Sequence, residues 1–111
     1  MANQVITADV VVAGAGHNSL ITAAYLAQAG KKVAVVDVRA RPGGGVDTEE
    51  LIPDFWVDTC STGHTLLRSN PVLAKDTLGL VKKHGLEYVD PDPVARVAFP
   101  DGEQFVMYKD L

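Results

Sequence analysis

The chain has 111 residues and a net charge of −4, and 47% of its residues are hydrophobic while 22% are charged. This length allows about one domain, and this balance is typical of a folded globular protein. The acidic charge argues against a nucleic-acid partner, and no apolar run is long enough to suggest a membrane span.

A single cysteine, Cys60, rules out an internal disulfide. Because the first strand pattern begins near Asp9, we expect no cleavable signal peptide. We therefore expect a cytoplasmic protein. We also expect Cys60 to be a small buried residue. No set of His, Cys, Asp and Glu residues has the spacing of a metal site, so we expect no bound metal.

The first 38 residues predict a strand, a helix and a second strand. Residues 9–13 (DVVVA) and 33–38 (VAVVDV) are apolar runs, typical of strands buried on both faces of a parallel sheet. Between them, His17 to Ala29 favour a helix that stops at Gly30. This order predicts a right-handed βαβ unit and an α/β fold class with a Rossmann-like domain.

The remaining sequence predicts a loop over residues 39–45 and three further structures. These are a pair of short strands at 48–51 and 55–58, a helix from Asn70-Pro71 to about His84 with Gly79 as a candidate break, and a hairpin with strands 94–99 and 104–108. We divide the chain into residues 1–60, which hold the βαβ unit and the loop, and residues 61–111.

A glycine-rich turn, Gly14-Ala15-Gly16-His17-Asn18-Ser19, joins the first strand to the helix. Gly14 permits a tight turn, and Gly16 lets the backbone approach a pyrophosphate. The helix N-terminus directs free N–H groups and a partial positive charge toward the same anion. Ser19 stands at the third position, which needs a small residue so that helix and strand can pack closely.

An acidic residue follows at the end of the second strand. Asp37 lies 21 residues after Gly16, where a carboxylate can accept hydrogen bonds from ribose hydroxyls. This order of elements predicts a dinucleotide-binding site: a strand, a glycine turn, a helix, a second strand and an acid. The alternative is a glycine-rich turn in some other α/β domain.

The loop from Arg39 to Gly45 (RARPGGG) distinguishes an FAD site from an NAD site. It resembles the arginine and double-glycine motif of FAD-dependent oxidoreductases in the amine oxidase and phytoene desaturase superfamily, in its phytoene dehydrogenase-related branch. The resemblance implies a loop that folds over the FAD pyrophosphate; the alternative is a flexible surface loop with incidental arginines. The cofactor-binding residues expected from the fingerprint and the resemblance are Gly14, Gly16, His17, Asn18, Asp37, Val38, Arg39, Arg41, Gly43, Gly44 and Gly45.

Two positions depart from the superfamily's pattern, namely Ser19 in place of the usual glycine and Gly45 where many members have an arginine. The resemblance also brings the segment 60–64 near the flavin or the substrate, which makes Ser61 and His64 candidates for hydrogen bonds there. No catalytic residue is identified. We expect the acidic run 47–50 to be a solvated edge, with Thr48 a candidate to line the cofactor channel.

The resemblance implies a flavin-dependent oxidoreductase that removes hydride from a C–C or C–N bond of a small-molecule substrate, with FAD as the acceptor. The chain is too short to be the whole enzyme, and its apolar strands need cover on both faces while it offers one crossover helix. We therefore expect a second polypeptide to supply the rest of the FAD and substrate domains; the chain is then a subunit, a cleavage product or a fragment. An NAD-binding module and a non-catalytic structural or regulatory subunit are the alternatives.

Overall fold

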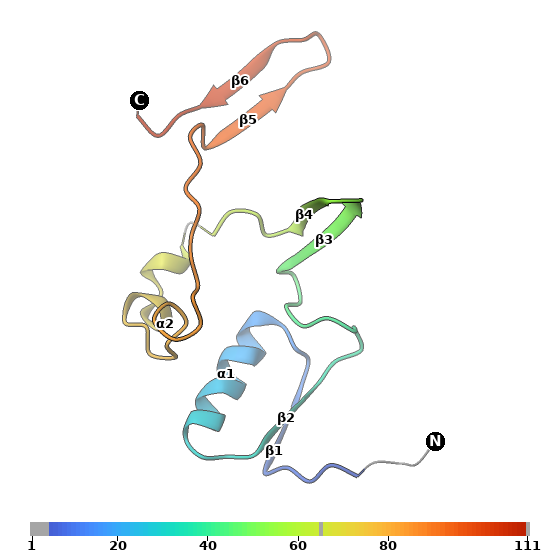
Figure 1. The fold of residues 1–111 in the computed structure, drawn as a ribbon, viewed down its shortest axis with the longest axis vertical. Coiled ribbons are helices and arrows are strands. Elements are labelled where there is room, and N and C mark those ends of the chain that lie inside the picture. The colour runs from blue at the N-terminus through green and yellow to red at the C-terminus, as the bar shows by residue number, and fades with distance from the viewer. Residues whose placement is uncertain (1–4, 65, 111) are drawn as a thin grey trace. The chain divides into compact units, whose positions relative to one another are not determined.

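The computed structural model describes residues 5–64 and 66–110, which form two compact units with their boundary between Leu78 and Gly79 (Figure 1). The first unit contains the βαβ unit, a hairpin and two short helices, and the second contains a hairpin. In chain order the elements are β1 (Val10–Ala13), α1 (His17–Gln28), β2 (Val33–Val36), β3 (Asp47–Ile52), β4 (Phe55–Cys60), the 3-10 helix η1 (Leu67–Ser69), α2 (Pro71–Ala74), β5 (Ala95–Ala98) and β6 (Gln104–Met107).

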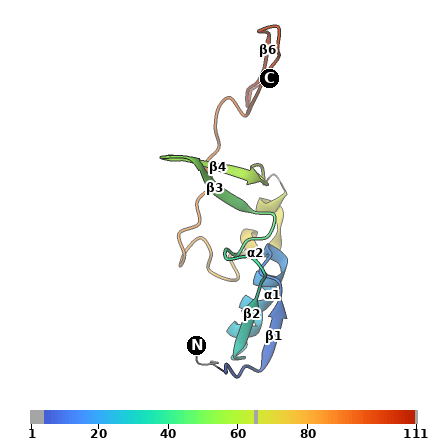
Figure 2. The same cartoon turned by 90° about the vertical axis from the view of Figure 1, so that its right-hand side faces the viewer.

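The βαβ prediction is confirmed. Strands β1 and β2 pair in parallel, with Val10 opposite Val33 and Ala13 opposite Val36. Helix α1 connects them and packs against both strands (Figure 2). Strand β2 ends two residues before the predicted limit of Val38, because the Asp37 carboxylate accepts the backbone N–H of Arg39 and turns the chain out of the strand direction.

Within the described residues the chain covers the two strands incompletely, which fits the single crossover helix that the sequence offers. Only Ala15 and Ala23 are buried there among the hydrophobic residues, each 7% exposed. The side chain of Val11 in β1 is 64% exposed and that of Val36 in β2 is 52% exposed. The physical reason is that α1 supplies a single layer, so an apolar sheet is left with an open surface.

Strands β3 and β4 form the predicted antiparallel hairpin around Asp54, whose φ of 68° lies in the left-handed region. All residues of β4 are exposed, including Phe55 at 64% and Trp56 at 65%. Cys60 is the last residue of this strand and is also exposed, so the prediction that it is buried is wrong. A two-stranded hairpin buries a side chain only where another layer packs on it.

The predicted helix over residues 70–84 is much shorter than expected. The helix begins at Asn70-Pro71 as predicted, because the Asn70 side-chain oxygen caps α2 by accepting the N–H of Val72 at 3.0 Å, but the helix ends at Ala74. Asp76 has a φ of 47°, which no α-helix accommodates. The next residue, Thr77, has its hydroxyl 2.5 Å from the Tyr25 hydroxyl, so a contact with α1 replaces continued helix.

In the second unit, a turn of backbone hydrogen bonds precedes the hairpin. The N–H of Lys83 donates to the Gly79 carbonyl at 2.8 Å, and Gly85 has a φ of 70°, which ends this turn. Strands β5 and β6 pair in antiparallel fashion, with Ala95 opposite Met107, which confirms the predicted hairpin. No helix in residues 5–64 or 66–110 has the length and apolar character needed to span a bilayer.

Candidate functional site

The turn between β1 and α1 places a helix end against the carboxyl end of a parallel strand pair. The Gly14 N–H donates to the Val36 carbonyl at 2.7 Å, which ties the turn to β2. Gly16 is the N-cap of α1, and no side chain within the described residues accepts a hydrogen bond at this cap. The first N–H groups of a helix have no partner inside it, so those of His17 and Asn18 are available to an anion.

The double-glycine loop folds back onto this turn. The Gly43 N–H donates to the Ala15 carbonyl at 2.7 Å, and Gly43 and Gly16 form a parallel β-bridge. Gly44 has a φ of 66°, and a Cβ added there would lie 2.9 Å from the Gly16 Cα. The two glycine segments are therefore in van der Waals contact, and a side chain on Gly44 would separate them.

The turn leaves room for a phosphate on its other side. A Cβ built on Gly16 would meet no atom within 4 Å, so open space adjoins the start of α1. Ser19 fits under the turn, because a Cβ on Gly14 would lie 4.0 Å from its hydroxyl oxygen. These features fit a dinucleotide pyrophosphate, which needs close backbone approach, unpaired N–H groups and the positive end of a helix.

Asp37 links the turn to the loop. One carboxylate oxygen accepts the N–H of Ala15 at 2.6 Å, and the other accepts the N–H of Arg39 at 2.8 Å. These two bonds, that from Ala15 above all, lower the pKa of Asp37 below its usual value. An ionised carboxylate has about four acceptor positions, so about two remain for ribose hydroxyls.

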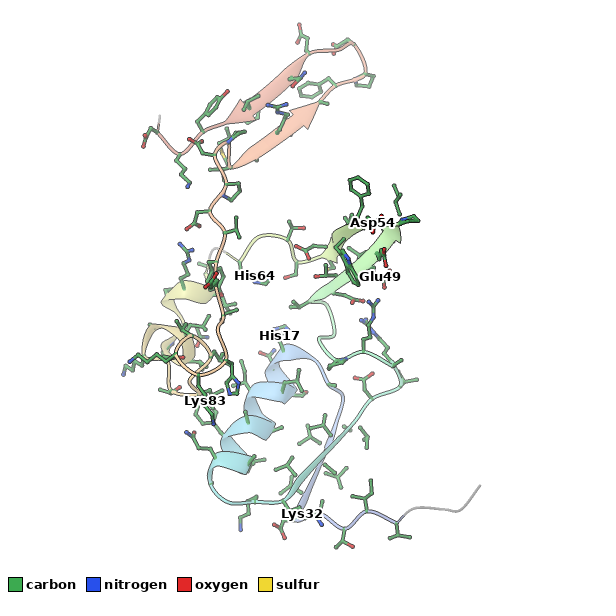
Figure 3. All side chains as sticks on the ribbon, in the orientation of Figure 1. His17, Lys32, Glu49, Asp54, His64 and Lys83 are labelled. Atoms are coloured by element: carbon green, nitrogen blue, oxygen red, sulfur yellow. The ribbon has the colours of Figure 1, made fainter. Side chains whose placement is uncertain are left out.

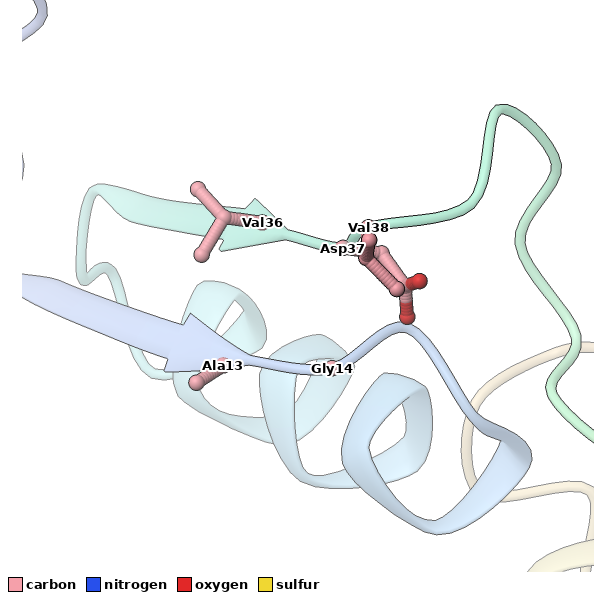
Figure 4. Close-up of a pocket in the computed structure, with 5 residues that line it drawn as sticks. All are labelled: Ala13, Gly14, Val36, Asp37 and Val38. Carbon is pink, nitrogen blue, oxygen red and sulfur yellow. The ribbon is translucent and has the colours of Figure 1, made fainter.

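The Asp37 carboxylate borders an open depression at the carboxyl ends of β1 and β2 (Figure 4). Ligands of open α/β sheets bind outside this edge of the sheet. Val38 also borders the depression and is fully exposed. The residues around the depression are Ala13, Gly14, Val36, Asp37 and Val38.

The arginines of the loop contact β3 and not the glycine turn. The Arg39 guanidinium lies 2.9 Å from the Asp47 carboxylate. The Arg41 guanidinium lies 2.8 Å from the Glu49 carboxylate and 3.5 Å from that of Asp47, and it donates to the Thr48 carbonyl at 3.1 Å. In this arrangement both positive charges are already matched by acids.

The expectation that the acidic run is a solvated edge is therefore wrong for Asp47, whose side chain is 15% exposed and faces two guanidinium groups. Sequence reasoning missed the partners of Arg39 and Arg41. Arg39 and Arg41 each precede their acid by eight residues, and this spacing brings the charges together only because the loop closes on itself. Thr48 donates its hydroxyl hydrogen to the Asp58 carboxylate at 2.6 Å, within the hairpin.

The other candidates lie at the ends of elements. His17 and Asn18 are exposed at the start of α1, and His64 lies in the segment that follows β4 (Figure 3). The Ser61 hydroxyl is 3.0 Å from a ring nitrogen of His64, so these two residues form a local pair. A Cβ on Gly45 would meet no atom within 4 Å. Within the described residues no group of three His, Cys, Asp or Glu side chains has the arrangement of a metal site.

The sequence resembles one protein family and several individual proteins. The family described as NAD(P)-binding Rossmann-like domain matches residues 12–76, which include the end of β1, all of α1 and β2, and the glycine loop. A limonene dehydrogenase subunit of Castellaniella defragrans is 42% identical over 109 residues, which is 98% of this chain and 19% of that protein. Phytoene dehydrogenase of Streptomyces griseus is 35% identical over 104 residues, which is 91% of this chain and 20% of that protein.

A mammalian protein is also similar. Pyridine nucleotide-disulfide oxidoreductase domain-containing protein 2 of Mus musculus is 45% identical over 85 residues, which is 77% of this chain and 14% of that protein. The chain thus spans about a fifth or less of the length of these relatives. No solved structure matches the chain.

Proposed function

This chain belongs to the family of NAD(P)-binding Rossmann-like domains, and from that premise we propose that it binds the ADP half of FAD in a flavin-dependent oxidoreductase. The observation that carries the proposal is the contact between the two glycine segments. Gly43 and Gly44 pack on Ala15 and Gly16 beside an uncapped helix end, which is the arrangement expected of a loop that covers a pyrophosphate. The likeness to two dehydrogenases supports the same reaction class.

The chain's own residues have binding roles in this proposal. Gly16 and the first N–H groups of α1 bind the pyrophosphate, and Asp37 accepts hydrogen bonds from the ribose. Arg39 and Arg41 stabilise the loop, and Val38 contacts the adenosine from the rim of the depression. FAD supplies the redox chemistry when bound, namely acceptance of a hydride from a C–C or C–N bond of a small-molecule substrate.

We also propose that another polypeptide segment, in the same or a separate chain, completes the FAD domain and supplies the substrate domain. Val11 at 64% exposure and Val36 at 52% exposure support this, because apolar parallel strands are normally covered on both faces. The small fraction of each relative that the chain spans supports it as well. One relative is itself named as a subunit.

The proposed compartment is the reducing cytoplasm. Cys60 is a free cysteine with an exposed side chain, and free exposed thiols are compatible with a reducing environment. The cysteine has no redox role in the proposal.

A second candidate, an NAD-binding module, is favoured by the family's own description as NAD(P)-binding. The test is to isolate the full chain from its host through an affinity tag, together with the polypeptides that accompany it. Acid denaturation should release FAD, seen as flavin absorbance and identified by chromatography. Release of NAD or NADP in place of FAD would establish the second candidate, and release of no nucleotide with no FAD uptake would refute the proposal.

Turnover separates an enzyme from a non-catalytic flavoprotein subunit. Limonene and phytoene, which appear in the names of two relatives, are the first probes to add to the isolated assembly under anaerobic conditions. Loss of the oxidised flavin absorbance on addition of a probe indicates hydride transfer to FAD. A flavin that is bleached by dithionite but by no unsaturated hydrocarbon or amine tested would favour the non-catalytic subunit.

A further inference from the structure

The loop between β2 and β3 is held at both of its ends by Arg39. At the start, the Arg39 N–H donates to the Asp37 carboxylate at 2.8 Å. At the other end, the Arg39 guanidinium pairs with Asp47, the first residue of β3, at 2.9 Å. We call the Arg39–Asp47 ion pair the loop clasp, because it brings together two residues that are eight positions apart.

The segment closed by the loop clasp contains the residues that contact the pyrophosphate turn. The Gly43 N–H donates to the Ala15 carbonyl at 2.7 Å, and the Val46 N–H donates to the Gly43 carbonyl at 3.1 Å. A Cβ on Gly43 would lie 2.2 Å from the Val46 carbonyl oxygen, so the chain doubles back tightly here. This compact conformation must be maintained in a segment rich in glycine, which loses more conformational entropy on ordering than any other residue.

We propose that the loop clasp is a positioning device that holds Gly43 and Gly44 against the pyrophosphate turn and so raises the affinity for the dinucleotide. The inference rests on the proposed function. Without the clasp, residues 40–46 would sample more conformations, and binding would have to order them. With the clasp, that ordering is already present before the cofactor binds.

The charges favour positioning over direct phosphate binding by Arg39. Its guanidinium faces Asp47, whose side chain is 15% exposed and therefore screened less than a fully solvated acid. A positive charge that is already matched attracts a phosphate weakly, so the net contribution of Arg39 comes through the loop. Arg41, at 3.5 Å from the same carboxylate, is held mainly by the Glu49 carboxylate at 2.8 Å and the Thr48 carbonyl at 3.1 Å.

The two explanations predict opposite effects of neutralising Asp47. If the loop clasp positions the loop, Asp47→Asn weakens nucleotide binding. If Asp47 instead competes with phosphate for Arg39, Asp47→Asn frees the Arg39 guanidinium, while Arg41 keeps its pair with Glu49, and nucleotide binding tightens. The matched control is Glu50→Gln, which removes the same charge from the same strand at a side chain bonded to the Asp54 N–H and to no arginine.

The experiment measures ADP affinity by titration calorimetry, with the tagged full chain and its accompanying polypeptides after the flavin has been removed. Arg39→Gln and Asp47→Asn should each weaken ADP binding about two- to fivefold, the range that a partly exposed ion pair allows. The double variant should bind ADP no more weakly than the single variant with the lower affinity. Asp47→Glu, which keeps the carboxylate, should bind ADP about as tightly as the parent. Tighter binding by Asp47→Asn, additive losses, or an equal loss in Glu50→Gln would overturn the inference.

A second measurement needs no bound nucleotide. Hydrogen exchange of the peptide that contains Gly43 reports the bond to the Ala15 carbonyl. Both single variants should exchange faster than the parent in this peptide by about two- to fivefold, while Glu50→Gln should not. Unchanged exchange would overturn the loop clasp itself. If the parent protein bound no ADP, the proposed function would fail, and the exchange measurement would still decide whether the clasp orders the loop.

Discussion

The glycine turn with its covering loop and the β3–β4 hairpin lie in one compact unit. They differ in whether other parts of that unit bond or cover their groups. In the turn and loop, backbone groups of Gly14, Ala15 and Gly43 are hydrogen-bonded to other parts of the unit. In the hairpin, Phe55 and Trp56 are more than 60% exposed. The candidate nucleotide site is therefore built from contacts inside this chain, whereas the exposed apolar surfaces are not covered by it.

The open face of the β1–β2 sheet is like the hairpin, because its apolar side chains are also exposed. A ligand site that consists of backbone N–H groups and glycines needs no large core, because hydrogen bonds and steric fit define it. A parallel sheet does need a core, since each apolar face that stays in water forfeits about 25 cal/mol for every Å² left exposed. The chain thus supplies the contacts that form the candidate site but only part of the packing that the sheet needs.

The largest effect is expected for Gly44→Ala. The added Cβ would lie 2.9 Å from the Gly16 Cα, and the φ of 66° is unfavourable for alanine, so the loop would be pushed off the turn. We expect ADP affinity to fall more than about tenfold. Gly45→Ala is the control, because its Cβ would meet nothing within 4 Å and should change affinity less than about twofold. Equal effects of the two substitutions would break the contrast between the two regions.

Asp37→Ala should weaken ADP binding about tenfold, because it removes ribose acceptors together with the acceptor for the Ala15 and Arg39 N–H groups. Asp37→Asn should cost less, since an amide oxygen still accepts one of these bonds. Titration of the flavin-free assembly checks both. An alanine variant that binds as tightly as the parent would contradict the ribose contact.

Short-range patterns made the βαβ unit, the glycine turn, Asp37 and both hairpins predictable from the sequence. Two features depended on longer-range contacts and were not. The helix after Asn70 was expected to reach His84, yet the segment 75–78 turns instead toward Tyr25, a contact that no local pattern encodes. Likewise, the pairing of Arg39 with Asp47 depends on how the loop closes, and local charge patterning suggested only a solvated edge.

Ser19→Gly should have a small effect on the site. The Ser19 hydroxyl oxygen lies 4.0 Å from the position of a Cβ on Gly14, which is ordinary van der Waals contact, so the hydroxymethyl group causes no crowding. We expect ADP affinity to change less than about twofold, with a small loss of helix stability because glycine is a poor helix former. A large loss of affinity would mean that the hydroxyl contacts the cofactor.

The smallest effect is expected from a change of pH. The N–H groups of Ala15 and Arg39 lower the pKa of Asp37 from 3.8, so this carboxylate stays ionised and keeps its bonds from pH 7 to pH 5. Its contribution is lost only as the pH falls through the lowered pKa. The ratio of ADP affinities between the parent and Asp37→Ala should therefore be the same at pH 7 and pH 5. A ratio that shrinks over this interval would indicate a raised pKa.

The most direct test of the contrast is to express residues 1–111 alone and follow the product by size-exclusion chromatography with light scattering and flavin absorbance. The exposed β1–β2 face and β3–β4 hairpin should make the isolated chain associate with itself, and it should retain little FAD. Addition of the polypeptides that accompany it in its host should yield one defined species that contains FAD. A monomeric, FAD-loaded chain with a cooperative unfolding transition would contradict the account.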